Sequence, residues 1–181
     1  MTDPIASPVL ATSRLILRPF TLDDAPVVQE LLAGPEVSET TQNIPYPYPD
    51  GAAATWIAGH RAAAEEGSML NWAVVREADA TLMGTIAIGL DRKNQRGTLG
   101  YWIGVPYWNQ GYMSEAATAV TEWAFQALRL NRVEALCLPR NPASARVMEK
   151  AGMTYEGILR GYIRKADHFE DLAIYARLIT D

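Results

Sequence analysis

The segment Tyr107–Ala116 contains the residue types that most clearly suggest a chemical role. It follows a strand-like stretch, Thr98–Val105, and leads into an alanine-rich amphipathic helix, Glu115–Leu128. A turn that contains a glycine, here Gly111, lets several backbone N–H groups point at one spot, and the helix dipole adds about half a positive charge there. Such a turn can hold a phosphate without a lysine. The segment therefore predicts a site for a phosphorylated cofactor.

The spacing within this turn excludes two common nucleotide-binding motifs. It has neither the G-x-G-x-x-G pattern of dinucleotide-binding folds nor the G-x-x-x-x-G-K-[ST] pattern of nucleotide triphosphatases. A turn that only packs a helix against a sheet would explain the glycine as well. A second motif is needed to decide between a binding role and a structural role.

That second motif is centred on Asn141. A short apolar strand, Val133–Leu138, precedes it. Asn141 is a typical helix N-cap, Pro142 suits the first helical position, and Gly152 suits the left-handed residue that ends a helix. Two strands that each end in a polar turn before a helix predict a cleft at their carboxyl ends.

The two motifs together resemble those of the GNAT superfamily of acyl-CoA-dependent N-acetyltransferases, and within it the RimJ/RimL type that acetylates protein N-termini. The resemblance covers nearly the whole chain and keeps the order of the family motifs. The matching segments are Thr12–Ala25, Gly100–Ile103, Trp108–Ala116, Asn141–Ser144, Glu156–Gly157 and Tyr175–Arg177. The resemblance implies an α/β GNAT fold. Its mixed, mostly antiparallel twisted sheet would split into a V at the fourth and fifth strands, with helices on both faces.

The same resemblance implies acetyl-CoA as the cofactor. The family places the pantetheine arm along the fourth strand, where the backbones of Ile103, Gly104 and Val105 would pair with it as an added strand does. One of these N–H groups would polarise the thioester carbonyl, a contribution of about 3 kcal/mol. The pyrophosphate would bind the N–H groups of Asn109, Gln110, Gly111, Tyr112, Met113 and Ser114.

Two methionines depart from the family pattern. Met113 is bulkier than the usual residue of the turn, and Met148 stands where many members have a tyrosine that protonates the leaving thiolate. In the RimJ/RimL branch a serine is the proposed substitute, and Ser144 matches its position. We expect Ser144 to donate a hydrogen bond to the sulfur, with a purely structural serine as the alternative. Asn141 would either cap its helix or bind the cofactor amide.

The acceptor side of the reaction is less clear from the sequence, because no residue stands out as a general base. Glu39 and Asp91 are candidates, whereas Glu115 fits a structural place in the first turn of its helix. Tyr101 would either line the acceptor pocket or pack in the core. Tyr46 lies in a proline-rich segment, Gly34–Asp50, that we expect to be a loop and a lid over the acceptor.

The lack of a base bears on the kind of amine. The reference pKa of an α-amine is about 2.5 units below that of lysine, so its deprotonation costs about 3.5 kcal/mol less. The sequence therefore favours direct attack by the α-amine of a protein or peptide N-terminus. Two alternatives stay open: an enzyme for a small-molecule amine (a polyamine, amino acid or aminoglycoside), and a non-catalytic acyl-CoA-binding sensor.

Composition and length limit the class of protein. With 181 residues, 49% of them apolar and 20% charged, the chain is expected to form one GNAT domain over residues 1–181. No apolar stretch is long enough to span a membrane, and Met1–Pro4 lacks the features of a signal peptide. The single cysteine, Cys137, cannot form an internal disulfide. We therefore expect a cytoplasmic protein that has no membrane partner.

Charge and metal-binding residues exclude further classes. A net charge of −5 argues against nucleic acid as a partner and suits a cationic acceptor. His60 and His168 have no neighbours at metal-ligand spacing, so no metal is expected. The sequence leaves the oligomeric state open between a monomer and a homodimer.

Hydrophobic periodicity and turn residues predict the elements that position these sites. The expected strands are Arg14–Phe20, Asn71–Arg76, Leu82–Leu90, Thr98–Val105, Val133–Leu138, Thr154–Arg164 and Glu170–Ile179. Further helices are expected at Leu22–Ala33, with Thr21 and Asp24 as a capping box, at Ala52–Glu66, and after Asn141.

Overall fold

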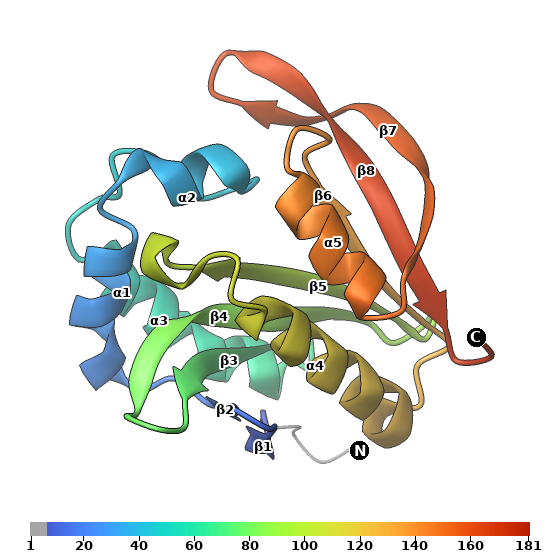
Figure 1. Ribbon diagram of the computed structural model, residues 1–181, viewed down its shortest axis with the longest axis horizontal. Coiled ribbons are helices and arrows are strands. Elements are labelled where there is room, and N and C mark those ends of the chain that lie inside the picture. The colour runs from blue at the N-terminus through green and yellow to red at the C-terminus, as the bar shows by residue number, and fades with distance from the viewer. Residues whose placement is uncertain (1–6) are drawn as a thin grey trace.

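The most apolar segments of the chain form the central strands of a mixed sheet in the computed structural model (Figure 1). The structure describes residues 7–181, so the N-terminal stretch considered for a signal peptide lies outside the described residues. The strands are β1 (Leu10–Ala11), β2 (Leu15–Arg18), β3 (Met69–Arg76), β4 (Thr81–Asp91), β5 (Arg96–Ile103), β6 (Arg132–Cys137), β7 (Thr154–Lys165) and β8 (His168–Leu178). The α-helices are α1 (Ala25–Leu31), α2 (Pro35–Thr40), α3 (Ala52–Glu65), α4 (Tyr112–Leu128) and α5 (Pro142–Lys150).

The described strands follow the order β1-β2-β3-β4-β5-β6-β8-β7. Only β5 and β6 run parallel, and α4 provides the crossover that parallel neighbours need. Their pairing is limited to Arg96–Leu99 against Arg132–Ala135. Beyond these residues β5 continues to Ile103 and β6 continues to Cys137, but the two strands no longer pair with each other. The sheet therefore opens as a V. The predicted mixed sheet with its split is confirmed. The expected fourth and fifth strands are β5 and β6, because the short strand β1 was not expected.

Helices cover both faces of the sheet. On one face α4 packs against a core cluster that includes Trp72, Ile86 and Val120. On the other face α1 and α3 pack through a smaller cluster that includes Val28 and Ile57. Burying one such side chain contributes about 1.5–3 kcal/mol, so these two layers hold the strands that flank the V in place. The expectation of helices on both faces is confirmed.

The N-terminal elements differ from the prediction in detail. The expected helix at Leu22–Ala33 is a 3₁₀ turn, Leu22–Asp24, followed by α1. The Thr21 N–H donates to Asp24 Oδ2 at 2.9 Å, so the expected capping box forms at this 3₁₀ turn. The proline-rich segment expected to be a loop contains α2, because Pro35 occupies the start of the helix, where a proline is tolerated.

Candidate active site

The first of two cavities at the V lies between β5, α4 and α5 and has a volume of about 300 Å³. Both sequence motifs contribute to it, since α4 begins after the first and α5 after the second. Of the predicted site residues, those that line it are Tyr101, Ile103, Asn109, Gly111, Tyr112, Met113, Ser114, Asn141 and Ser144. Gly104, Val105 and Gln110 are not among its lining residues.

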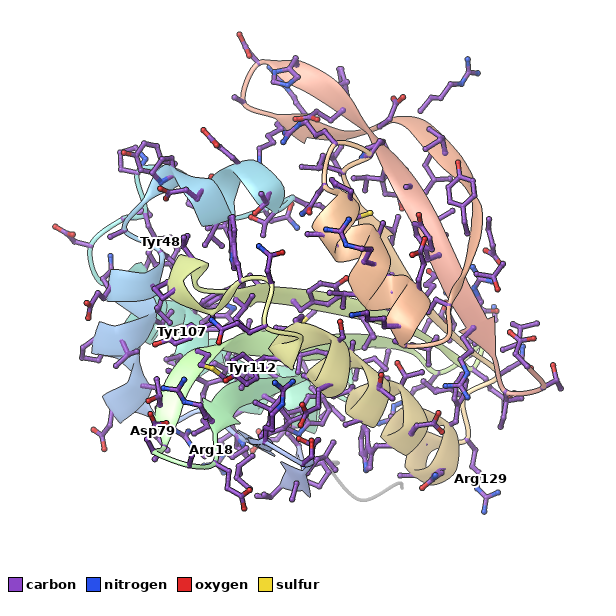
Figure 2. All side chains as sticks on the ribbon, viewed as in Figure 1. Arg18, Tyr48, Asp79, Tyr107, Tyr112 and Arg129 are labelled. Carbon is purple, nitrogen blue, oxygen red and sulfur yellow. The ribbon has the colours of Figure 1, made fainter. Side chains whose placement is uncertain are left out.

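The turn before α4 has the geometry of an anion site. Gly111 is the N-cap with φ of +81°, and Asn109 also has a positive φ, +59°. No side chain of the described residues caps this helix. The first N–H groups of a helix have no intrahelical partner, so those at Tyr112, Met113 and Ser114 face the cavity side without one. Figure 2 shows Tyr107 and Tyr112 near the beginning of α4. These N–H groups could bind the oxygen atoms of a phosphate or pyrophosphate.

Two basic side chains beside this turn were missed by the sequence reasoning. Arg146 and Lys150 lie four residues apart on α5, and both line the cavity. Residues four apart share one face of a helix, so their spacing after Asn141 was the signal that could have identified them. Their positive charge complements a phosphorylated cofactor.

The two unexpected methionines lie in the core. Met113 is 5% exposed and belongs to the cluster that joins α4 to the sheet, although part of it lines the cavity. Met148 is 1% exposed in the same cluster. Their side chains therefore fill core space that α4 and α5 leave against the sheet.

The three residues expected to pair with the cofactor arm differ in whether their backbone N–H and C=O groups are free to bind it. The Gly104 N–H donates to Met83 O at 2.8 Å and its C=O accepts from Tyr107 N at 2.9 Å, so neither backbone group is available. The Ile103 C=O accepts from Trp108 Nε1 at 2.7 Å. Successive N–H groups of a strand point to opposite sides, so with Gly104 bonded to β4 the N–H of Ile103 faces the V. Val105 lies after the strand in a 3₁₀ turn.

The second cavity, of about 1020 Å³, lies on the other face of the sheet beside α3. Side chains alternate between faces along a strand, so Gly100 and Trp102 of β5 face this cavity while Ile103 faces the first. The two cavities share part of their lining at the V. The shared residues are Thr40, Thr41, Tyr101, Trp102 and Ser144.

Two hydroxyl groups meet where the cavities join. The Tyr101 hydroxyl lies 2.9 Å from Ser144 Oγ, and either can donate to the other. Tyr101 also donates to the Ser144 carbonyl at 3.1 Å. Burial raises the pKa of Tyr101, so its hydroxyl keeps its proton at neutral pH. This junction therefore contains a protonated hydroxyl pair suited to stabilising a negative charge.

Asn141 connects the two helices that flank the junction. Its Oδ1 accepts from Ser144 N at 3.1 Å, which makes it the N-cap of α5, and its Nδ2 donates to Thr40 O at 3.1 Å. Both polar groups of the amide thus have partners within the chain. Of the two roles expected for Asn141, this geometry favours capping.

Side chains from the C-terminal half hold α2 across the V. Lys165 Nζ donates to the carbonyls of Ser38 and Thr41. Arg140 Nη1 donates to the carbonyl of Glu39 at 2.8 Å. These bonds satisfy carbonyls at the end of α2, which would otherwise lack partners. They place Thr40 and Thr41 in the lining of both cavities.

The structure places two expected acceptor residues elsewhere. Glu39 is exposed and Tyr46 is 55% exposed, and neither lines either cavity. Tyr48, two residues along the same loop, lines the second cavity instead, and burial raises its pKa (Figure 2). Both tyrosines lie in the loop expected at the acceptor, and no local sequence signal distinguishes the one that faces the cavity from the one that faces solvent.

Carboxylates are scarce at these cavities. Among the described residues that line them, Asp50 in the second cavity is the one with a carboxylate. Glu115 is engaged by Thr12, Ser13 and Arg14, in line with the structural place expected for it. In residues 7–181 no group of three His, Cys, Asp or Glu could hold a metal ion, and no helix is long and apolar enough to cross a membrane.

Comparison with known proteins gives a consistent result. Residues 14–154 match the family described as Acetyltransferase (GNAT) domain. The uncharacterized N-acetyltransferase YoaA of Bacillus subtilis is 31% identical over 175 residues, which cover 93% of this chain and 96% of that protein. The ribosomal-protein-serine acetyltransferase of Escherichia coli is 30% identical over 99 residues, covering 54% of this chain and 55% of that one. The structure of RimL, a ribosomal L7/L12 alpha-N-protein acetyltransferase in complex with coenzyme A, shares the fold with a TM-score of 0.84 at 19% identity, covering 95% and 97% of the two chains.

Proposed function

The chain belongs to the GNAT family of acetyltransferases, and we propose that the amine it acetylates is the N-terminal α-amine of a protein or peptide. It is an acetyl-CoA-dependent N-acetyltransferase, which removes the alternative of a non-catalytic sensor. The observation that carries the choice of amine is the junction of the two cavities, which has two hydroxyl groups and no carboxylate among the described residues.

The lack of a carboxylate at the junction of the two cavities favours one class of amine. Attack on a thioester requires a neutral amine, and a site without a base relies on the fraction that is already deprotonated. The reference pKa of an α-amine is about 7.7–8.0 against about 10.4 for lysine, so this fraction is larger by more than a factor of 100 at neutral pH. An α-amine is therefore the acceptor that depends least on a general base for its deprotonation.

Different residues of the chain would bind the cofactor, polarise its thioester carbonyl and stabilise the departing thiolate. When bound, acetyl-CoA supplies a thioester that the amine attacks directly. The Ile103 N–H faces the V and would polarise the thioester carbonyl, while the turn Asn109–Ser114, with Arg146 and Lys150, would hold the phosphates. The Ser144 and Tyr101 hydroxyls would donate to the departing thiolate.

Relatives support a protein acceptor. The Escherichia coli relative is named for acetylating a serine of a ribosomal protein, and RimL for acetylating an α-amine of ribosomal L7/L12. A small-molecule amine is the second candidate, because a cavity of about 1020 Å³ is within the size range of sites that enclose small ligands.

An acceptor panel tests the proposal. Thiol release from acetyl-CoA would be measured with peptides whose α-amine is free, with the same peptides blocked at that amine but containing lysine, and with polyamines and aminoglycosides. Release with the free α-amine peptides alone is the expected result. Release with polyamines or aminoglycosides alone would replace the proposal with the small-molecule candidate. Calorimetry with CoA shows in parallel that the protein used is competent to bind the cofactor.

A further inference from the structure

We propose that the second cavity selects amines with a bulky, uncharged, apolar group beside the reacting nitrogen, and that Asn71 hydrogen-bonds a neutral polar group of that acceptor. The inference rests on the proposed function, because it names the substrate class of the same site. Its ligand is thus a peptide N-terminus whose first side chain is large and apolar.

The walls of the cavity are mainly apolar. Side chains from the end of α1, from α3 and the loop before it, and from β3, β5 and β6 surround the space, and they include Leu32, Tyr48, Trp56, Met69, Trp102 and Leu136. Burial of apolar surface contributes about 25 cal/mol per Å², so an apolar acceptor group gains affinity here in proportion to its size.

The floor of the cavity is formed by small residues. Gly100 of β5 lies opposite Ala87 of β4, and Ala87 lies opposite Asn71 of β3. A Cβ added at Gly100 would meet no atom within 4 Å, so the space above the floor is open and not filled by neighbouring side chains. This floor gives the cavity depth, into which a large group can extend.

A largely buried polar side chain, Asn71, lines this apolar space. Asn71 is 6% exposed and lines the cavity. Its backbone N–H donates to Ser7 Oγ at 3.2 Å, and no residue within 7–181 forms a hydrogen bond with its side-chain amide. The amide is open to the cavity, where a ligand carrying a hydrogen-bonding group can reach it, and one such hydrogen bond contributes about 0.5–1.5 kcal/mol. The peptide C=O or N–H that follows an N-terminal residue is such a group.

Charge excludes two other classes of amine from this space. No lysine or arginine lines the cavity among the described residues, so the carboxylate of a free amino acid has no cationic partner. Asp50 is the one carboxylate in the lining, so a polyamine would leave most of its charges unpaired. A peptide N-terminus has neither problem, since its carboxyl group is an amide.

The wild-type enzyme gives the first test through a series of minimal N-termini. The value of kcat/KM would be compared for phenylalaninamide, leucinamide, glycinamide, lysinamide and free phenylalanine. We expect phenylalaninamide and leucinamide to exceed glycinamide by about 10- to 100-fold, and free phenylalanine and lysinamide to fall well below them. Equal values across the series, or a preference for glycinamide, would overturn the inference.

A substitution at the floor tests where the selectivity arises. Gly100→Leu would place a side chain in the open space, and we expect it to lower kcat/KM for phenylalaninamide about tenfold or more while changing that for glycinamide little. Gly59→Leu is the matched control, because Gly59 is an exposed helical residue with no atom within 4 Å of an added Cβ and does not line the cavity. An equal loss for both amides in Gly100→Leu would contradict the assignment.

The role of Asn71 is tested by removing either partner of the hydrogen bond. Asn71→Leu should lower kcat/KM for phenylalaninamide about tenfold but leave that for phenethylamine, which lacks the amide, nearly unchanged. Equal effects on both amines would show that Asn71 does not bind the amide. Binding can be followed without turnover, since Trp56 and Trp102 line the cavity and their fluorescence should respond to phenylalaninamide in the presence of CoA. No response at saturating CoA would also count against the site.

These results separate the inference from the function on which it rests. If no α-amine of the series is acetylated but a polyamine is, the proposed function fails. If the α-amines are acetylated at rates that do not depend on the size and charge of the acceptor, the proposed function stands and the inference about the second cavity fails.

Discussion

The two cavities that meet at Tyr101 and Ser144 are built in different ways. The first cavity, which we propose holds the cofactor (the cofactor side), takes its polar groups from the backbone of one continuous turn, Asn109–Ser114, and from the first turns of α4 and α5. The second cavity, which we propose holds the acceptor (the acceptor side), is made of side chains that come from α3, four strands and the loop before α3. A site built from local backbone is determined by local sequence, whereas a site built from distant side chains depends on the whole fold.

The charges of the two cavities also differ. Arg146 and Lys150 line the cofactor side, while Asp50 is the one charged residue in the lining of the acceptor side, within the described part of the chain. The first cavity is therefore suited to an anion of known shape, and the second to a largely neutral group. The following predictions test this contrast, from the largest expected effect to the smallest.

Removing a hydroxyl at the junction should affect turnover most. We expect Ser144→Ala and Tyr101→Phe each to lower kcat by about 100-fold with the affinity for acetyl-CoA nearly unchanged, since the thiolate forms late in the reaction. Because the two hydroxyls are hydrogen-bonded at 2.9 Å, the double variant should lose much less than the product of the two effects. Calorimetry provides the control: a matching loss of acetyl-CoA affinity would assign these hydroxyls to binding.

Distorting the turn should affect the cofactor alone. Gly111 has φ of +81°, a conformation that a β-branched residue adopts only with strain, so Gly111→Val should weaken CoA binding about tenfold or more. Gly161→Val is the matched control, since Gly161 also has a positive φ, +55°, but lies in the β7–β8 hairpin. Equal effects of the two substitutions in calorimetry would mean that the turn does not hold the phosphates.

The carboxylate that anchors this turn should contribute to stability. Although burial opposes it, hydrogen bonds from Thr12 and Arg14 lower the pKa of Glu115. Its stabilising effect is therefore present above its usual pKa and is lost as the pH falls through the lowered value. We expect Glu115→Gln to reduce the free energy of unfolding at pH 7 by about 2 kcal/mol. Denaturant unfolding checks this, with the exposed Glu65→Gln as a control that should change stability by less than about 0.5 kcal/mol.

The acceptor side should respond to mild acid. His60 packs against Trp56 with ring centroids 4.4 Å apart, and burial lowers its pKa to about 4 from the ordinary value of 6.5. As the pH falls, His60 is protonated in the unfolded chain before it is protonated in the folded chain. The free energy of unfolding should therefore decline as the pH falls from 6.5 towards 4. The change should amount to about 1–2 kcal/mol, because the residue as a whole is only partly buried although both ring nitrogens are covered. In His60→Phe the melting temperature should depend less on pH over this range; an unchanged dependence would locate the effect elsewhere.

What the sequence could predict follows the same division. The caps of α5 at Asn141, Pro142 and Gly152 were predicted correctly because capping depends on adjacent residues. The turn before α4 and its place in the cofactor-side cavity were predicted for the same reason. The family resemblance supplied the split sheet, which no local pattern specifies.

The acceptor side shows where sequence reasoning ends. Glu39 and Tyr46 were expected at the acceptor, but α2 and its loop are oriented by bonds from Arg140 and Lys165, more than 100 residues later in the chain. Asn71 was not noticed, because an asparagine in an apolar strand has meaning only once its neighbours on both sides are known. Contacts between residues far apart in the chain decide which side chains face the cavity, and such contacts cannot be predicted from local patterns in one sequence.

The most direct test of the account is the initial-velocity pattern with acetyl-CoA and a free α-amine peptide varied together. Two cavities that join at one point require both substrates to be bound when the amine attacks. Direct attack within such a ternary complex therefore predicts intersecting reciprocal plots. Parallel plots would indicate an acetylated enzyme intermediate, for which Cys137, buried beside Ser144 with its pKa raised by burial, is the available thiol, and they would contradict direct attack.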